Sequence, residues 1–72
     1  MDLVLVLGRN VRRLRRLRGL SQEQLALEAD MKRSYVSDLE RGTRNPTVRA
    51  VERLATALGV QGKDLLDETS RS

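Results

Sequence analysis

The sequence predicts an all-α domain of five short helices. Apolar residues recur at spacings of three and four, the period of an α-helix, and the alternation typical of strands is nearly absent. Helix-starting residues such as Ser21 and helix-ending glycines such as Gly42 and Gly59 divide this pattern into segments. A chain of 72 residues fits one domain. We therefore expect residues 1–72 to form a single domain, with a frayed tail over about 68–72.

The composition excludes several classes of function. The chain has no Cys and no His, and Tyr35 is its one aromatic residue. Disulfides, the usual zinc sites and catalytic Ser/His/Asp or Cys/His arrangements are therefore excluded. We expect no metal, no cofactor and no enzymatic activity. The core must come from Leu, Val and Ala, and so thin a core is often supplemented by a second subunit.

The apolar N-terminus, "MDLVLVLG", does not have the pattern of a targeting segment. Asp2 precedes the apolar run and the arginines follow it, which reverses the order of a signal peptide. The run is also far shorter than the roughly 20 residues of a membrane span. A cytoplasmic protein with no membrane contact is expected.

Charge is distributed unevenly. Residues 1–20 hold six arginines and one Asp, the charged residues of 21–31 are all acidic, and residues 32–53 hold six basic and three acidic residues. A basic surface beside an acidic strip indicates an anionic partner. The alternative is an ordinary solvated helix surface.

The first helix is predicted to start after Asp2, run to about Arg18 and end at Gly19. Its buried stripe is expected at Leu3, Leu7, Val11, Leu14 and Leu17. Residues 4–6 are also apolar, which suits either core packing or a subunit contact.

The second and third helices form a recognisable pair. Ser21 and Gln24 can form a capping box at the start of a helix over about 22–28, with Leu25, Ala26 and Ala29 facing inward. A tight turn over 29–32 is expected to place Asp30 in the left-handed conformation.

The third helix, over about 33–41, turns only Val36 and Leu39 inward. Its outward face carries Arg33, Ser34, Ser37, Asp38 and Arg41. Two helices joined by about four residues, the second with so thin an apolar stripe, predict a helix-turn-helix motif. The second helix of that motif enters the major groove of DNA, which explains why it buries so little of itself.

Beyond a loop at residues 43–46, Thr47 can cap a fourth helix that ends at Gly59. Its inward residues are expected to be Val48, Val51, Leu54, Ala55 and Leu58. A last turn or two is expected over 62–67. Apolar residues at this end exceed what so small a monomer covers, so we expect a two-fold interface formed by Val60, Leu65 and Leu66.

Each outward residue of the third helix has a chemical use on DNA. Arg33 can donate two hydrogen bonds to guanine, and Ser34 and Ser37 are small enough to permit close approach. Asp38 can accept a hydrogen bond from cytosine. Alternatively it pairs with Arg41 or Arg44, which is the interpretation we favour.

Other polar residues suit phosphates, which position a protein without reading sequence. Arg41, Arg44 and Asn45 lie where the chain leaves the third helix. Gln22 lies among the free amides at the start of the second helix, where it either meets a phosphate or is a plain helix-start residue. Tyr35 either contacts the DNA backbone or a thymine methyl group, or packs in the core.

The strings "LSQEQLA" and "YVSDLERG" and the spacing of "P-x-x-x-x-x-x-LA-x-AL" resemble the helix-turn-helix family of phage repressors, Cro and xenobiotic-response-element (XRE) regulators. Residues 20–60 carry the resemblance. Within that family, "RSYVSDLERGTRN" is similar to the controller proteins of restriction–modification systems, which have R-T-Y-I-S-x-I-E-R-G-x-R-N here.

The resemblance implies a lambda-repressor-like fold and a homodimer on an inverted-repeat operator. It places base reading on Arg33, Ser34, Ser37 and Asp38. It places phosphate contacts on Gln22, Tyr35, Arg41, Arg44 and Asn45. It also implies a buried ion pair between Arg15 and Glu40, which their helical spacing allows. The sequence departs from the family at Lys32, where a capping residue is common, and at Asp30, where Gly is common.

These observations predict a sequence-specific regulator of transcription that binds double-stranded DNA, in the nucleoid of a prokaryotic cell or encoded by a phage. A small-molecule effector is not expected, because no ligand domain fits. The first alternative is an antitoxin-like protein-interaction module with exposed Val4, Leu5 and Leu27. The second is an RNA-binding protein, which would lack the aromatic platforms that stack on unpaired bases.

Overall fold

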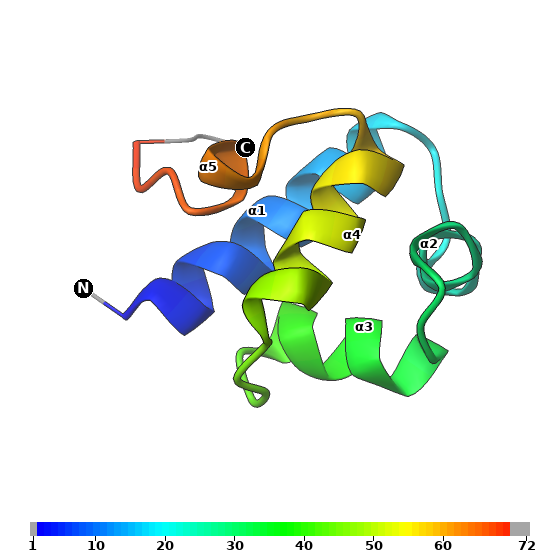
Figure 1. The fold of residues 1–72 in the computed structure, drawn as a ribbon, viewed down its shortest axis with the longest axis horizontal. Helices are drawn as coiled ribbons and strands as arrows, with labels where there is room; N and C mark the ends of the chain where they lie inside the picture. Colours follow the sequence, from blue (N-terminus) through cyan, green and yellow to red (C-terminus); the bar gives the residue numbers. More distant parts are fainter. Residues whose placement is uncertain (1, 70–72) are drawn as a thin grey trace.

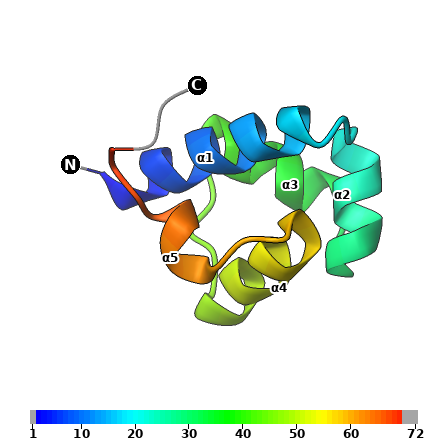
Figure 2. The same ribbon diagram turned by 90° about the horizontal axis from the view of Figure 1, so that it is seen from above.

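The computed structural model describes residues 2–69, which contain five α-helices and no strand. The helices are α1 (Leu3–Leu17), α2 (Gln22–Ala29), α3 (Arg33–Arg41), α4 (Val48–Leu58) and α5 (Gly62–Leu65). Figure 1 shows α3 along the lower edge and α2 at the right, and Figure 2 shows α1 and α4 on opposite sides of the molecule. The predicted all-α class and the order of the five helices are confirmed.

The helix starts follow the predicted capping chemistry. The Asp2 carboxylate accepts the Val4 N–H at 2.9 Å. Ser21 and Gln24 form the full capping box, at 3.0 and 2.8 Å. Such caps satisfy amides that a helix start otherwise leaves unpaired. At the start of α3, Lys32 makes no side-chain cap, as its chemistry predicts.

The turn between α2 and α3 is as tight as expected. Asp30 has φ 57° and ψ 53°, in the left-handed region. The Met31 N–H then donates to the Ala26 carbonyl at 2.9 Å, which closes the end of α2. This turn fixes the direction in which α3 leaves α2.

One apolar core joins all five helices. Leu7, Val11, Leu25, Val36, Leu39, Leu54 and Leu65 are its largest members that lose essentially all exposure. Three residues predicted to face inward do not: Leu3 is 50% exposed, Leu17 72% and Val48 86%. Each lies at the first or last position of its helix, where no neighbouring helix covers it. Val6, Ala50 and Ala57 are buried instead.

Gly8 allows α1 to pack directly on α3. A Cβ atom at this position would collide with the Leu39 carbonyl oxygen, which belongs to the backbone of α3. Gly8 is buried within α1. The missing side chain therefore sets the distance between the two helices, and with it the position of the α3 outward face.

Asn10 fastens the C-terminal segment to α1. Its Nδ2 atom donates to the Leu65 carbonyl at 2.9 Å and to the Asp67 carbonyl at 3.1 Å. Leu65 has 0% exposure within the single chain. Its side chain completes the monomer core and has no free surface for a second subunit, so the prediction of Leu65 as an interface residue is wrong.

The chain beyond α5 turns back on itself. The Thr69 hydroxyl donates to the Asp67 carboxylate at 2.6 Å and the Thr69 N–H donates at 2.9 Å. These bonds, the hydroxyl first, hold the pKa of Asp67 below its ordinary value. Glu68 and Thr69 form a turn here rather than the frayed end that was expected, and residues 70–72 of the predicted tail lie outside the described residues.

Candidate nucleic-acid interface

The outward face of α3 is a continuous polar surface, as predicted. Five side chains line a shallow hollow along the helix: Arg33, Ser34, Ser37, Asp38 and Arg41. Val36 and Leu39 point the other way and have 0% exposure. The helix lies along one edge of the molecule, so this face is open to a large partner (Figure 1). Within the hollow, Arg33 is exposed at the N-terminal end of the helix, the position from which recognition helices reach bases.

Asp38 joins two arginines at the other end of this face. Its carboxylate accepts from Arg41 at 2.5 Å and from Arg44 at 3.4 Å. The ion-pair alternative for Asp38 is therefore confirmed in the free chain. Pairs this exposed contribute at most about 1 kcal/mol to stability, so DNA phosphates can displace the carboxylate at little cost. The pairs hold both guanidinium groups beside the outward face of α3.

Tyr35 packs partly in the core, which agrees with one of its two interpretations, and its contact with DNA stays a prediction. The ring is half-buried against the core. Its exposed face carries the Arg44 guanidinium, whose central carbon lies 4.5 Å from the ring centroid. Stacking of this kind orients an arginine without neutralising it. Asn45 follows in the exposed loop that leads to α4.

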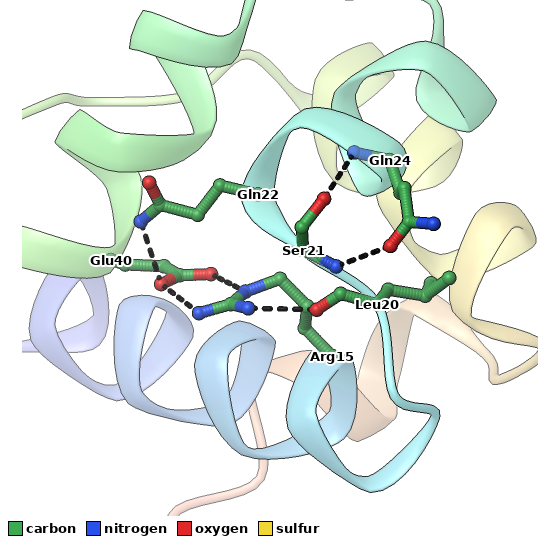
Figure 3. Close-up of polar contacts among 6 residues, drawn as sticks. All are labelled: Arg15, Leu20, Ser21, Gln22, Gln24 and Glu40. Carbon is green, nitrogen blue, oxygen red and sulfur yellow. Dashed lines mark hydrogen bonds and ion pairs between the residues drawn. The ribbon is translucent and has the colours of Figure 1, made fainter.

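The predicted ion pair between Arg15 and Glu40 is confirmed, and it is bidentate. Arg15 Nε donates to Glu40 Oε2 at 2.7 Å and Arg15 Nη2 donates to Oε1 at 3.0 Å. The two side chains are 11% and 5% exposed. Arg15 also donates to the Leu20 carbonyl at 2.8 Å, so one guanidinium joins α1, α3 and the segment before α2 (Figure 3).

Gln22 is the third member of this network. Its Nε2 atom donates to Glu40 Oε1 at 3.1 Å, and Figure 3 shows Gln22 and Arg15 converging on the same carboxylate. The side-chain carbonyl and the second amide hydrogen of Gln22 remain available to a ligand. The sequence predicted Gln22 as a phosphate contact but gave no sign that Glu40 orients it, because the two residues are 18 positions apart.

The structure adds two arginines that the sequence did not single out. Arg49 and Arg53 on α4 line a hollow together with Tyr35 and Thr47, next to the first turn of α3. Their only signal in the sequence was a spacing of four on the fourth helix, which places them on one face. This hollow continues the basic surface from α3 onto α4.

The described residues hold no cluster of potential metal ligands. None of the helices between residues 2 and 69 is both long and apolar enough to cross a membrane.

The fold and this surface define a class of protein. A helix-turn-helix family model matches residues 11–65, and the chain belongs to this family. The match spans α2, the turn and α3, together with the helices that support them.

The chain is similar to two controller proteins of known sequence or structure. The control protein C.BamHI of Bacillus amyloliquefaciens is 51% identical over 67 residues, which cover 92% of this chain and 83% of that protein. The crystal structure of the restriction-modification controller protein C.AhdI from Aeromonas hydrophila has a TM-score of 0.84 and 42% identity. It covers 86% of this chain and 94% of that one.

A further solved structure contains nucleic acid. The master regulator for biofilm formation SinR, crystallised in complex with DNA, has a TM-score of 0.81 and 32% identity. The match covers 85% of this chain and 98% of the SinR chain. The chain is thus similar to proteins named as controllers and regulators, one of them solved on DNA.

Proposed function

We propose that this chain is a sequence-specific regulator of transcription that binds double-stranded DNA through α3. The observation that carries the proposal is the outward face of α3, which is entirely polar and lies on a helix-turn-helix framework. Arg33 grips a guanine with two hydrogen bonds, and Ser34 and Ser37 allow the helix to lie deep in the groove. No catalytic step is assigned to the chain.

Phosphate contacts on both sides of α3 set its register on the duplex. On one side Gln22, oriented by Glu40, meets the backbone together with the free amides at the start of α2. On the other side Arg41, Arg44 and Asn45 meet it where the chain leaves α3. Asp38 releases Arg41 and Arg44 to phosphates when DNA arrives, because a phosphate carries at least as much charge as the carboxylate it replaces.

A restriction–modification controller is the narrower form of this proposal. It is supported by the 51% identity to C.BamHI and by the likeness to C.AhdI. We expect such a protein to act on double-stranded DNA in the cytoplasm of a prokaryotic cell. We propose that residues 1–72 act as one domain.

We propose a homodimer as the acting form. Leu66 is 40% exposed and Val60 is half-buried at the C-terminal end. Both remain candidates for the interface, whereas Leu65 is buried in the core of the single chain. A two-fold axis there would present two α3 helices to one side of a duplex. Half-sites about 10 base pairs apart would then form an inverted repeat.

The antitoxin-like alternative receives less support from the arrangement of apolar residues. Val4 and Leu5 lie in the first turn of α1, beside the N-terminus, whereas Leu27 lies on α2. Figures 1 and 2 both place the N-terminal end of α1 and α2 at opposite ends of the molecule. The three residues therefore do not form one docking surface.

Selection from a random pool of double-stranded DNA tests the proposal. The purified protein is mixed with the pool, and bound fragments are sequenced after several rounds. We expect one inverted repeat to be enriched, with half-sites about one helical turn apart. Absence of any enriched sequence, or enrichment only from a pool of unpaired RNA, would overturn the proposal.

A further inference from the structure

A second basic surface lies on α1, away from the outward face of α3. It is the arginine stripe, defined as Arg9, Arg12, Arg13 and Arg16, which together line a shallow hollow. The spacing of three and four places all four residues on one face of the helix. The opposite face of α1 packs on the core through Leu7 and Val11. The stripe therefore faces outward, and its role is independent of core packing.

The exposed members of the stripe lack acidic partners. Arg9, Arg12 and Arg16 are exposed, and none of them makes an ion pair with any residue between 2 and 69. Like charges at this spacing repel one another and weaken a helix. A face that keeps three exposed arginines against this repulsion is suited to an anionic partner that neutralises them.

The chemistry of the stripe favours a nucleic-acid backbone over an acidic protein. Between positions 9 and 16, every exposed residue is an arginine. A stable protein interface centres on apolar or aromatic side chains. The exposed apolar residues of α1, Leu3, Leu5 and Leu17, lie beyond the two ends of the stripe and not within it. A row of guanidinium groups without apolar anchors matches the sequence-independent contact that phosphates make.

The position of the stripe connects it to the proposed DNA surface. Arg16 follows Arg15, whose guanidinium shares the Glu40 carboxylate with Gln22 (Figure 3). The C-terminal end of the stripe thus lies near the start of α2, where the proposed phosphate contact of Gln22 is made. From there the stripe runs about 10 Å along α1 to Arg9.

We propose that the arginine stripe binds the phosphate backbone of the duplex that flanks the operator, beyond the outer phosphate held at Gln22. The inference rests on the proposed function, because it requires the operator to be bound through α3. The hollow lined by the stripe shares no residue with the hollow along α3, so we expect a straight, short operator bound to α3 not to reach it. Flanking DNA reaches it when the duplex curves towards α1.

The test compares two duplexes that carry the same selected operator. One is about 20 base pairs long, enough for two half-sites, and the other about 60. Three proteins are measured over a range of salt: the unchanged chain, a variant with Arg9→Gln, Arg12→Gln and Arg16→Gln, and a matched variant with Lys at the same three positions. Arg13 is left unchanged because it is half-buried. Thermal melting checks that each variant is folded.

The expected result is a dependence on duplex length that requires charge. At low salt the unchanged chain binds the long duplex at least about tenfold more tightly than the short one, with a steeper salt slope. The slope difference approaches about one per arginine that meets a phosphate. The Gln variant loses this gain but keeps its affinity for the short duplex, and the Lys variant retains most of it.

Two outcomes would overturn the inference. The first is that the ratio of the affinity for the long duplex to that for the short duplex is the same for the unchanged chain and for the Gln variant. The other is a Lys variant that behaves like the Gln variant. Failure of the proposed function itself is seen separately, as loss of any preference of the unchanged chain for the short operator over a scrambled duplex of equal length.

Discussion

At the scale of single residues, the smallest side chain has one of the largest structural effects. Gly8 lies where the backbone of α3 leaves no room for a Cβ atom, and the obstacle is the Leu39 carbonyl rather than a flexible side chain. Either α1 or α3 must move to accept any other residue.

We therefore expect Gly8→Ala to destabilise the protein by about 1–3 kcal/mol, the usual cost of overpacking. Gly62→Ala is the matched control, because a Cβ there meets nothing within 4 Å. Alanine also favours a helix over glycine, so the control should melt at the same temperature or slightly higher. Urea denaturation of both variants measures the difference. Equal free energies of unfolding would show that the close approach of α1 and α3 is not tight.

Glu40 is the residue on which two side chains, Arg15 and Gln22, depend for position. Removing it leaves the Arg15 guanidinium, only 11% exposed, without its carboxylate, and releases Gln22. Breaking one partner of a buried pair costs roughly 3–5 kcal/mol. Glu40→Ala should therefore unfold far more easily than Glu28→Ala, which removes an exposed carboxylate of α2.

Thermal melting of these two glutamate variants at one pH and salt concentration measures the effect. The account would be contradicted if Glu40→Ala and Glu28→Ala had equal melting temperatures, because the pair would then be solvated in solution.

At the scale of helices, the sequence correctly predicted which helices form and in what order. It predicted less well which of their apolar side chains are buried. Caps such as Ser21 and Thr47 act over two or three residues, so the sequence alone contains the information. Burial depends on where neighbouring helices end. Leu3 and Leu17 share the apolar stripe of α1 but extend past its neighbours, which a periodicity cannot reveal.

The short helix α5 shows the same limit. Two adjacent leucines predicted an interface, yet they divide between two roles. Leu65 fills the core and Leu66 remains 40% exposed. The sequence could not assign them, because the rotation of a four-residue helix is fixed by the Asn10 hydrogen bonds to the chain around it.

We expect Leu66→Lys to weaken dimerisation by tenfold or more, because it places charge in an apolar interface. Leu27→Lys is the control, since Leu27 is 77% exposed on α2, far from the proposed axis. Sedimentation equilibrium across a range of protein concentrations gives the dissociation constants. The homodimer would be contradicted if the unchanged chain were a monomer at high micromolar concentration, both free and on DNA.

At the scale of the whole molecule, polar residues are arranged by the fold into separate surfaces. The sequence predicted the outward face of α3 because its residues lie within nine consecutive positions. It did not predict that Arg49 and Arg53 extend this surface, nor that Glu40 orients Gln22. Those relations join different helices, and only the packing of α1, α3 and α4 creates them.

The central claim is that α3 reads bases at its N-terminal end and holds phosphates at its C-terminal end. Arg33 and Arg41 carry the same charge, lie two turns apart on the same face and should act differently. Arg33→Ala should cost about 1–3 kcal/mol of binding and relax the preference at one base pair per half-site. Arg41→Ala should weaken binding to all sequences alike and lower the salt slope by about one per subunit.

The most direct measurement is the affinity of both variants for a panel of operators with single-base changes, over a range of salt. We expect only Arg33→Ala to alter the ranking of the panel and only Arg41→Ala to lower all affinities in parallel. The reverse assignment would show that the helix lies in the groove in the opposite sense. If neither variant changed affinity or ranking, α3 would not be the element that reads DNA.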